Sequence, residues 1–429
     1  MSSPASPAVT PSPGSGDAPV ARASYRDVLG VREFRVIFTA NIVSMLGNVV
    51  SYVALTVLIY DQTGSAALAA LVMALSFLPY LIGGTLLGAA VDRWPARRVL
   101  VACDLASAVV VAVMVIPAVP VAGLLALLFA NGLIAPVYQG VRASILPDIL
   151  APGAPYILGR SLMRLVAQGA QIAGYGVGGL LLAVLPPRGA LAADALSFAA
   201  SGLLLWLGLA RRPPRTAPGS GQASPGQASA VARDSLTGLR STLAHRATRR
   251  VLLFGWLVPA CAVAPEALAA PYAAHIGQPS RVAGFLLMGI PVGIVAADIV
   301  VARLLSPRWQ QRLIVPAALL SFAALAAFAV SPGLGVALAL LVVAGIGSAY
   351  MVGLDGLLVA VAPSGLRNRA LALSNTGLMF TQGAGFALWG LAGQYAPLPA
   401  VIPAAAIAGA VAVIALRPPG ERPDRPGQE

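Results

Sequence analysis

The chain has 429 residues, of which 58% are hydrophobic and only 10% are charged. A soluble protein of this length would need more polar surface to cover its core, so the mean hydropathy of +0.84 indicates an integral membrane protein. The net charge of +13 comes from arginines alone, because the chain has no lysine. These arginines flank apolar stretches, which is typical of membrane topology and of contacts with anionic lipids and argues against nucleic-acid binding.

Residues 1–35 are rich in Ser, Pro, Ala and Gly. They include no apolar region before a small-residue cleavage site, so we expect a disordered cytoplasmic tail and not a signal peptide. Twelve apolar stretches follow, each near the roughly 20 residues that cross a bilayer, and without the alternation of barrel strands. The twelve lie at 36–60, 66–91, 99–117, 121–141, 161–185, 190–210, 251–273, 281–305, 312–331, 333–361, 370–393 and 397–416.

The longest polar interruption, residues 211–250, divides the twelve stretches into two groups of six. Its Pro, Gly, Ser and Gln content is typical of a linker. The sequence therefore predicts an all-helical membrane protein with six-helix bundles at 36–210 and 251–416, a cytoplasmic linker at 211–250 and a cytoplasmic tail at 417–429. Similar Pro- and Arg-bearing connections after the fourth and tenth stretches favour two pseudo-symmetric halves with a substrate site between them.

The arginines also predict the orientation. If the amino terminus is cytoplasmic, only Arg188 and Arg281 fall on the far side of the membrane. Because basic residues concentrate on the cytoplasmic side, we expect both termini in the cytoplasm. The lysine-free composition, rich in Ala, Gly and Pro, is typical of a high-GC bacterial genome, so we expect a multi-pass protein of the bacterial cell membrane.

Other classes find little support in the sequence. Cys103 and Cys261 lie in separate predicted helices and form neither a disulfide framework nor a metal-ligand motif. His245 and His275 are placed on opposite sides of the membrane, and no His-Glu-x-x-His pattern occurs, which argues against an intramembrane enzyme. A phosphate loop ending in Gly-Lys-Ser or Gly-Lys-Thr is absent, so a single-chain ATP-driven pump is unsupported and no cofactor or metal is expected.

Several motifs carry a family resemblance. They are Ser44 to Asn48 and Leu58 to Ala66 at the first helix, Gly88 to Arg98 after the second, Leu146 to Leu150 after the fourth, and Ala193 to Phe198 in the sixth. By these motifs the chain resembles the major facilitator superfamily, and within it the twelve-helix drug and siderophore exporters, which include macrolide efflux and enterobactin export proteins. The resemblance covers 30–416 and implies two bundles that work by alternating access.

The hairpin after the second helix also has a physical interpretation. Asp92 ends a helix and precedes three arginines, so it can pair with a cation or lie near the positive end of another helix. The resemblance implies that Asp92 braces the two halves when the cavity faces outward, with Arg142 and the region of Arg369 as partners. Alternatively, these charges only mark a cytoplasmic loop. The candidate latch comprises Gly88, Asp92, Arg93, Arg97, Arg98 and Arg142.

Acids inside membrane helices are costly and often functional. Glu266 in the seventh helix lies between Pro265 and Pro271, which can interrupt the helix and open its backbone to a polar cavity. Glu266 is therefore the first candidate for a proton carrier or substrate contact, and Asp355 in the tenth helix is the second. The alternative for Glu266 is a hydrogen-bonded structural acid.

Two further acids are interpreted as structural. Asp104, six residues from Arg98, is expected to join the cytoplasmic charge network. Asp194, close in sequence to Arg188, is expected at the outer surface.

Polar residues at helical spacing are candidates for lining the cavity. Asn41, Asn48 and Tyr52 share a face of the first helix. Exporter relatives often have an aspartate in place of Asn48, and an amide cannot exchange a proton near neutral pH, so a proton carrier must lie elsewhere. The alternative for each polar residue is an interhelical hydrogen bond. The candidates are Asn41, Asn48, Tyr52, Asn131, Tyr138, Gln168, Gln171 and Gln382.

Gly174, Gly178 and Gly179 on the fifth helix permit close packing with other helices. Antiporters of the superfamily have a Gly-Pro motif here, but Tyr175 stands where the proline is expected, so the motif alone does not indicate antiport.

Together these features predict a monomeric secondary transporter that exports a hydrophobic or amphiphilic small molecule, such as a drug, secondary metabolite or siderophore. Its expected partners are this substrate, protons exchanged by antiport, and membrane lipids. The alternatives are a non-transporting scaffold or sensor on the same fold, and an importer or facilitator of a small metabolite.

Overall fold

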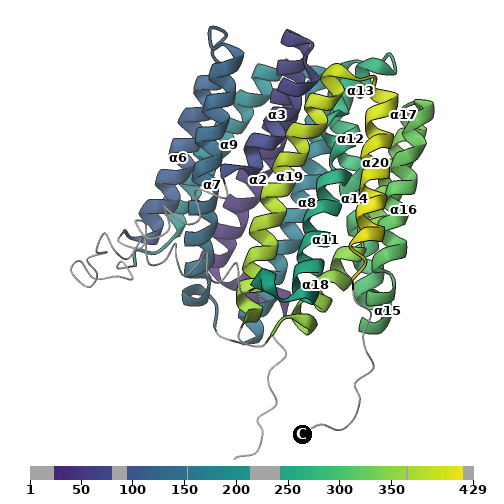
Figure 1. The fold of residues 1–429 in the computed structure, drawn as a ribbon. Helices are drawn as coiled ribbons and strands as arrows, with labels where there is room; N and C mark the ends of the chain where they lie inside the picture. Colours follow the sequence, from purple (N-terminus) through teal and green to yellow (C-terminus); the bar gives the residue numbers. More distant parts are fainter. Residues whose placement is uncertain (1–23, 80–93, 152, 213–241, 364–365, 419–429) are drawn as a thin grey trace, which may run out of the picture.

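The computed structural model describes residues 24–79, 94–151, 153–212, 242–363 and 366–418. These parts of the chain form long helices that run side by side, and they contain no strand (Figure 1). The short helix α1 (Tyr25–Gly30) and the last turn of α20 (Leu398–Ala415) lie at one end of the molecule, which we name the termini face. The other end is the opposite face.

The helices divide into two bundles. The N-terminal bundle contains α2 (Arg32–Thr63), α3 (Ala66–Phe77), α6 (Ala96–Val115), α7 (Val121–Ile149), α8 (Ala154–Val184) and α9 (Pro187–Gly208). The C-terminal bundle contains α11 (Arg246–Ala262), α12 (Ala264–Ala267), α13 (Ala269–His275), η1 (Ser280–Val282), α14 (Ala283–Leu304), α15 (Pro307–Arg312), α16 (Ile314–Ala326), η2 (Ala327–Val330), α17 (Leu334–Gly347), α18 (Tyr350–Val361), α19 (Arg367–Tyr395) and α20.

Nine helical segments of the described chain are long and apolar enough to cross a membrane. Two shorter apolar segments, 66–77 and 314–330, and the 29-residue α19 account for the other three predicted crossings. The second crossing is described only up to residue 79. The predicted fold class, an all-helical membrane protein built from twelve helices in two bundles, is confirmed.

Local sequence determines where the first two helices meet. Gly64 adopts the left-handed conformation, with φ of 64°, and its N–H donates to the Tyr60 carbonyl, which ends α2. The Ser65 hydroxyl then accepts from the Leu68 N–H at 3.2 Å and caps α3. This Gly-Ser pair makes a two-residue turn at the opposite face.

Two predicted boundaries shift. The tail predicted for 1–35 contains α1 and the start of α2, because Ser24 and Asp27 form a capping box and Val28 is buried against Phe34. The linker predicted for 211–250 contains the first turn of α11, which begins at Arg246.

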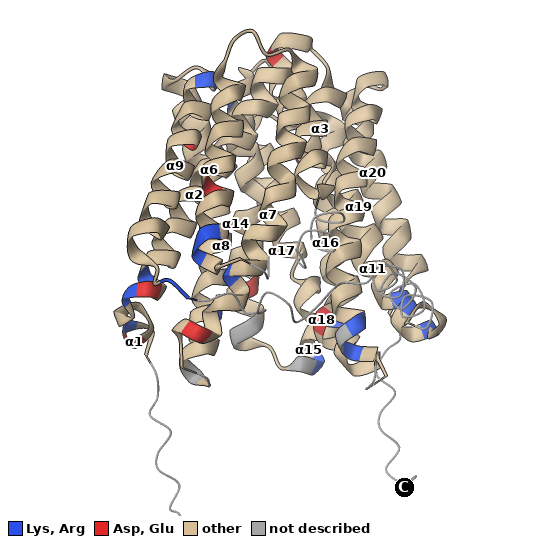
Figure 2. Ribbon diagram, turned by 90° about the vertical axis from the view of Figure 1, so that its left-hand side faces the viewer, with Lys and Arg blue, Asp and Glu red and all other residues tan. Residues whose placement is uncertain are grey.

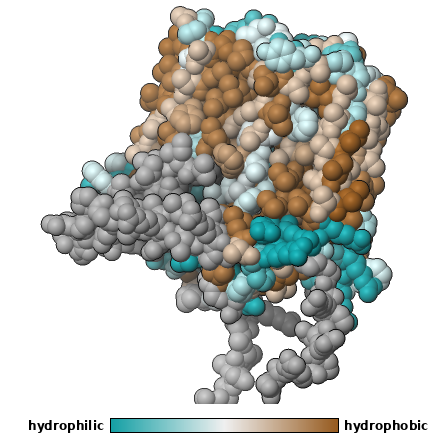
Figure 3. Space-filling model, in the orientation of Figure 1, coloured by the Kyte–Doolittle hydropathy of each residue, from teal (hydrophilic) through white to brown (hydrophobic). Residues whose placement is uncertain are grey.

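The flanks of the molecule are apolar. Figure 3 shows hydrophobic residues over the sides of the helices, and Figure 2 shows most charged residues of the described chain gathered at the termini face. Large hydrophobic side chains such as Leu196 and Leu207 of α9 are exposed. An apolar flank between polar ends is the surface expected of a multi-pass membrane protein.

The two bundles contact each other in the half of the molecule nearer the opposite face. There α3 packs on α19, and the second half of α8 packs on the first turns of α14. These contacts bring residues of α8 close to residues of the C-terminal bundle.

Candidate functional site

Glu266 lies on a broken helix. Pro259, Pro265 and Pro271 interrupt the crossing that contains it, because proline has no N–H to donate and its ring clashes with the preceding turn. The backbone leaves ideal helical geometry at Val263 and again at Leu268, so Glu266 sits on the four-residue helix α12 between two irregular points. The Glu266 side chain is half-buried on this segment.

Tyr175 approaches Glu266 from the other bundle. It lies on α8, is buried, and is close enough to Glu266 for the two groups to interact electrostatically. The Gln171 amide donates to the Tyr175 hydroxyl at 3.5 Å. We name Gln171, Tyr175 and Glu266 the Tyr175 cluster. The structure thus brings together two predicted residues, Gln171 and Glu266. The third member, Tyr175, was identified in the sequence only as a departure from the Gly-Pro motif.

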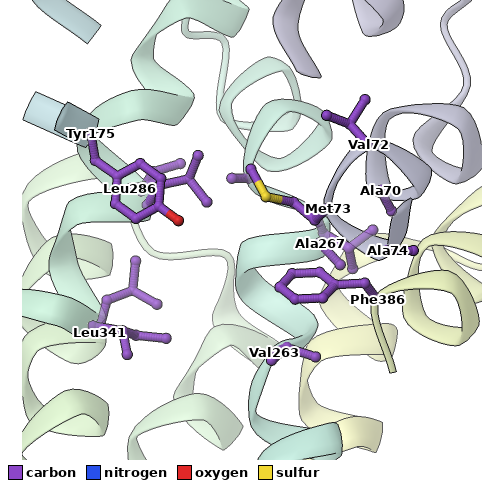
Figure 4. Close-up of a cluster of buried hydrophobic side chains, with 14 of the residues drawn as sticks. Ala70, Val72, Met73, Ala74, Tyr175, Val263, Ala267, Leu286, Leu341 and Phe386 are labelled. Atoms are coloured by element: carbon purple, nitrogen blue, oxygen red, sulfur yellow. The ribbon is translucent and has the colours of Figure 1, made fainter. Parts of the chain in front are cut away.

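Apolar side chains surround the Tyr175 cluster. Figure 4 shows Tyr175 of α8 and Met73 of α3 extending toward one another, with Phe386 of α19 and Val263 beside them. The rings of Phe77 and Phe386 stack across the bundles with centroids 5.5 Å apart. One acid and one phenol among aromatic and aliphatic groups form a site that suits a molecule with a large apolar body and few polar groups.

Glycines allow the bundles to meet closely beside this site. A side chain at Gly284 of α14 would lie 2.7 Å from the Gly179 nitrogen and 2.9 Å from the Tyr175 carbonyl of α8. Gly174 and Gly178 of α8 instead face Val49 and Val53 of α2, inside the N-terminal bundle. Of the three predicted packing glycines, Gly179 therefore contacts the other bundle, and its partner Gly284 was not singled out in the sequence.

The cavity-lining candidates on α2 and α7 form two groups. Asn41 is buried and accepts a hydrogen bond from the Arg142 guanidinium, which also lies 5.9 Å from the centre of the Tyr138 ring. Asn48 and Tyr52 lie one turn apart on α2, with the Asn48 amide 3.5 Å from the Tyr52 hydroxyl.

The remaining candidates are more scattered. The Asn131 side-chain carbonyl is buried without a hydrogen-bond partner among the described residues, which marks a polar group with unused bonding capacity inside the N-terminal bundle. Gln382 of α19 is half-buried, one residue from the α3 contact at Gly383. Gln168 lies on α8, but its side chain is outside the described part of the structure. Asp355 is exposed on α18 in the half nearer the termini face, away from Glu266.

The predicted latch is described only in part. Gly88, Asp92 and Arg93 lie outside the described residues. Arg97 stacks on the Trp206 ring at 4.8 Å and donates to the Trp206 carbonyl, and Arg98 is exposed. The contacts named here for Arg97 and Arg142 are therefore made within the N-terminal bundle.

The surroundings predicted from the sequence are wrong for two buried acids, Asp104 and Asp194. Asp194 is 1% exposed and accepts hydrogen bonds from Ser51 and Ser197, whereas Arg188 donates to carbonyls at the end of α6. Asp104 is 2% exposed and accepts from Ser201 at 2.6 Å. Neither lies at a surface, because Asp194 is buried where α9 meets α2 and Asp104 is buried where α6 meets α9. The Ala193 to Phe198 motif was the available signal for Asp194.

A model of the family described as Major Facilitator Superfamily matches residues 37–335. Similar solved structures include a variant of the peptide transporter POT, with 14% identity over 89% of this chain and 93% of that chain and a TM-score of 0.69. The nucleoside transporter NupG, also as a variant, has 15% identity, 89% and 98% coverage and a TM-score of 0.66.

A third similar structure is the human organic anion transporter MFSD10, with 18% identity, 90% and 99% coverage and a TM-score of 0.61. A search of the curated proteins found no match to this chain. At these identities the solved structures show a shared fold and not a shared substrate.

Proposed function

The chain belongs to the major facilitator superfamily and has the fold of a secondary transporter, and we propose that it exports a hydrophobic or amphiphilic small molecule by alternating access. In this proposal it is a monomer in a bacterial cell membrane, with the termini face in the cytoplasm. The non-transporting scaffold and the importer remain the alternatives, and both are outcomes of the experiment below.

The observation that supports this substrate class is the apolar character of the side chains around the Tyr175 cluster. Glu266 is the acid of this proposed site, and aromatic and aliphatic side chains from both bundles, among them Met73, Val263 and Phe386, gather beside Tyr175. A strongly polar substrate would lose its hydration in such a site without enough replacement hydrogen bonds. An amphiphile keeps its apolar body in the site and directs its polar group to Glu266 or Tyr175.

The contacts between the bundles support the transport cycle. The Phe77–Phe386 stack and the Gly179–Gly284 contact close the half nearer the opposite face. A substrate in the Tyr175 cluster can leave through that face only after these contacts separate. If the termini face is cytoplasmic, the described conformation is the one that loads substrate from the cytoplasm.

Glu266 is the proposed coupling acid. It lies in the substrate space, so proton and substrate can compete for one carboxylate, which is the simplest basis for antiport. Asn48 cannot carry the proton, and Asp355 lies away from the cluster, so it is the second candidate.

Dye efflux from intact cells tests this proposal. Cells without efflux pumps of their own are loaded with ethidium, an amphiphilic cation, or with a neutral amphiphilic dye, and the loss of fluorescence is followed. We expect faster loss of at least one dye from cells that express the protein than from the same cells without it. Faster uptake indicates an importer, and no flux of either dye contradicts the proposed export and is the result expected of a non-transporting scaffold.

A further inference from the structure

The buried carboxyl of Asp194 lies inside the N-terminal bundle, apart from the Tyr175 cluster. It belongs to α9, is 1% exposed, and accepts hydrogen bonds from the Ser51 hydroxyl of α2 and, at 3.1 Å, from the Ser197 hydroxyl. Gly47 of α2 leaves room for this carboxyl, because a side chain there would overlap both Asp194 and Ser197. These residues therefore enclose the Asp194 carboxyl in a closed compartment between α2 and α9.

Within the described part of the chain, no charge compensates that of an ionised Asp194. The helices packed against α9 at this level are α2 and α6, and no charged or titratable side chain of their described residues acts on Asp194. Asp104 of α6, another buried acid of this bundle, bonds to Ser201, seven residues or about two turns farther along α9. An ionised carboxylate without a cation is costly in such a place, so the neutral acid is favoured.

The face of α2 that contacts Asp194 adjoins a polar face of the same helix. Gly47 and Ser51 are four residues apart and share the face that meets α9. Asn48 and Tyr52, each one residue further, lie about 100° around the same helix and form the pair predicted to line the cavity. A change in how α2 packs on Asp194 therefore moves Asn48 and Tyr52 as well.

We propose that Asp194, with Ser51, forms a proton-binding site in the N-terminal bundle whose protonation state governs the packing of α2 against α9. With the proton bound, Asp194 is neutral and the compartment stays dry and closed. When the proton leaves, the carboxylate attracts water, α2 separates from α9, and the Asn48–Tyr52 face shifts. The site thus makes the packing of α2 depend on a proton. Asn48 of α2 cannot do this, because an amide does not exchange a proton near neutral pH.

This inference rests on the proposed transport function for its role, but its test uses no substrate. Infrared spectra of the full-length protein in liposomes are recorded between pH 5 and pH 9, where a neutral carboxyl shows a C=O stretch that an ionised one lacks. We expect a carboxyl band that falls as the pH rises. Asp194→Asn should lose this component, and Ser51→Ala, which keeps the acid and removes a hydrogen bond, should shift its frequency.

Asp104→Asn is the matched control, because it removes a buried, serine-bonded acid of the same bundle whose hydrogen bond goes to Ser201 of α9 and not to α2. It should leave the Asp194 component in place. A band unchanged in both Asp194→Asn and Ser51→Ala overturns the proposal, and so does a band that does not vary with pH.

Hydrogen exchange over residues 44–55 then tests the link to α2. The protection of this segment should fall at high pH in the parent relative to Asp194→Asn at the same pH. Equal protection in the two proteins at every pH would show that Asp194 binds a proton without governing α2. Failure of dye export with these results intact would refute the proposed export and leave the proton-binding site standing.

Discussion

A methyl group at Gly284 tests whether the α8–α14 contact controls which face is closed. In Gly284→Ala the added carbon would lie 2.7 and 2.8 Å from the Gly179 nitrogen and α-carbon and 2.9 Å from the Tyr175 carbonyl, all of them backbone atoms that cannot rotate away. Overpacking of this kind costs about 1–3 kcal/mol. The cost applies only while the bundles touch near the opposite face, so it shifts the equilibrium toward separation there by about 5- to 150-fold.

Spin labels across the opposite face measure this shift. Asp61 at the end of α2 and Ser280 of η1 line one groove of about 450 Å³ between the bundles, so a nitroxide pair at Asp61→Cys and Ser280→Cys reports their separation. The native Cys103 and Cys261 are replaced by serine. We expect Gly284→Ala to add a longer-distance population that is minor in the parent.

Gly169→Ala on α8 is the control, because a β-carbon at Gly169 would meet no atom of the described structure within 4 Å. It should leave the distance distribution unchanged. An unchanged distribution in a folded Gly284→Ala protein would refute the idea that this glycine contact sets the closed state.

Four other predictions concern topology, the latch, stability and coupling. A reporter fused within 211–250 should be active only in the cytoplasmic sense, and detection of that loop outside intact cells would overturn the orientation. Asp92→Asn should shift the conformational equilibrium by about 1–3 kcal/mol and sharply reduce transport, whereas parental flux at equal expression would identify the hairpin as a topological marker only. Tyr272→Phe removes the 2.7 Å bond to the Pro332 carbonyl and should lower the free energy of unfolding by about 1–3 kcal/mol, which thermal denaturation in detergent can check. Glu266→Gln should abolish pH-driven uphill efflux and retain downhill exchange; if uphill efflux persists, Asp355→Asn is the next variant to test.

Helix number and order could be predicted because each apolar stretch is about as long as a membrane is thick. The interruption around Glu266 could be predicted as well, because proline removes a backbone donor wherever it occurs. Both signals are local and need no knowledge of neighbouring helices.

Contacts between distant helices could not be predicted in the same way. Asp194 was assigned to the neighbourhood of Arg188, but its partner Ser51 is 143 residues away. Arg97 was assigned to the latch, yet it contacts Trp206, 109 residues away. In each case the deciding factor was which face of a helix meets which neighbour, and one sequence does not contain that information.

The Gly179–Gly284 contact shows the same limit. In sequence each glycine is one of 45, and most of them lie in apolar runs. Only the crossing of α8 and α14 distinguishes this pair from the rest.

Transport by the purified protein in liposomes tests the central claim most directly. Vesicles with the termini face outward are given an acidic interior, and ethidium or a neutral amphiphilic dye is added outside, where it faces the side proposed to be cytoplasmic. The account predicts accumulation of dye inside above its external concentration, dissipation of that gradient when the pH difference is collapsed, and only equilibration with Glu266→Gln. Equal internal and external dye in the parent protein under the same pH gradient would contradict a proton-driven exporter.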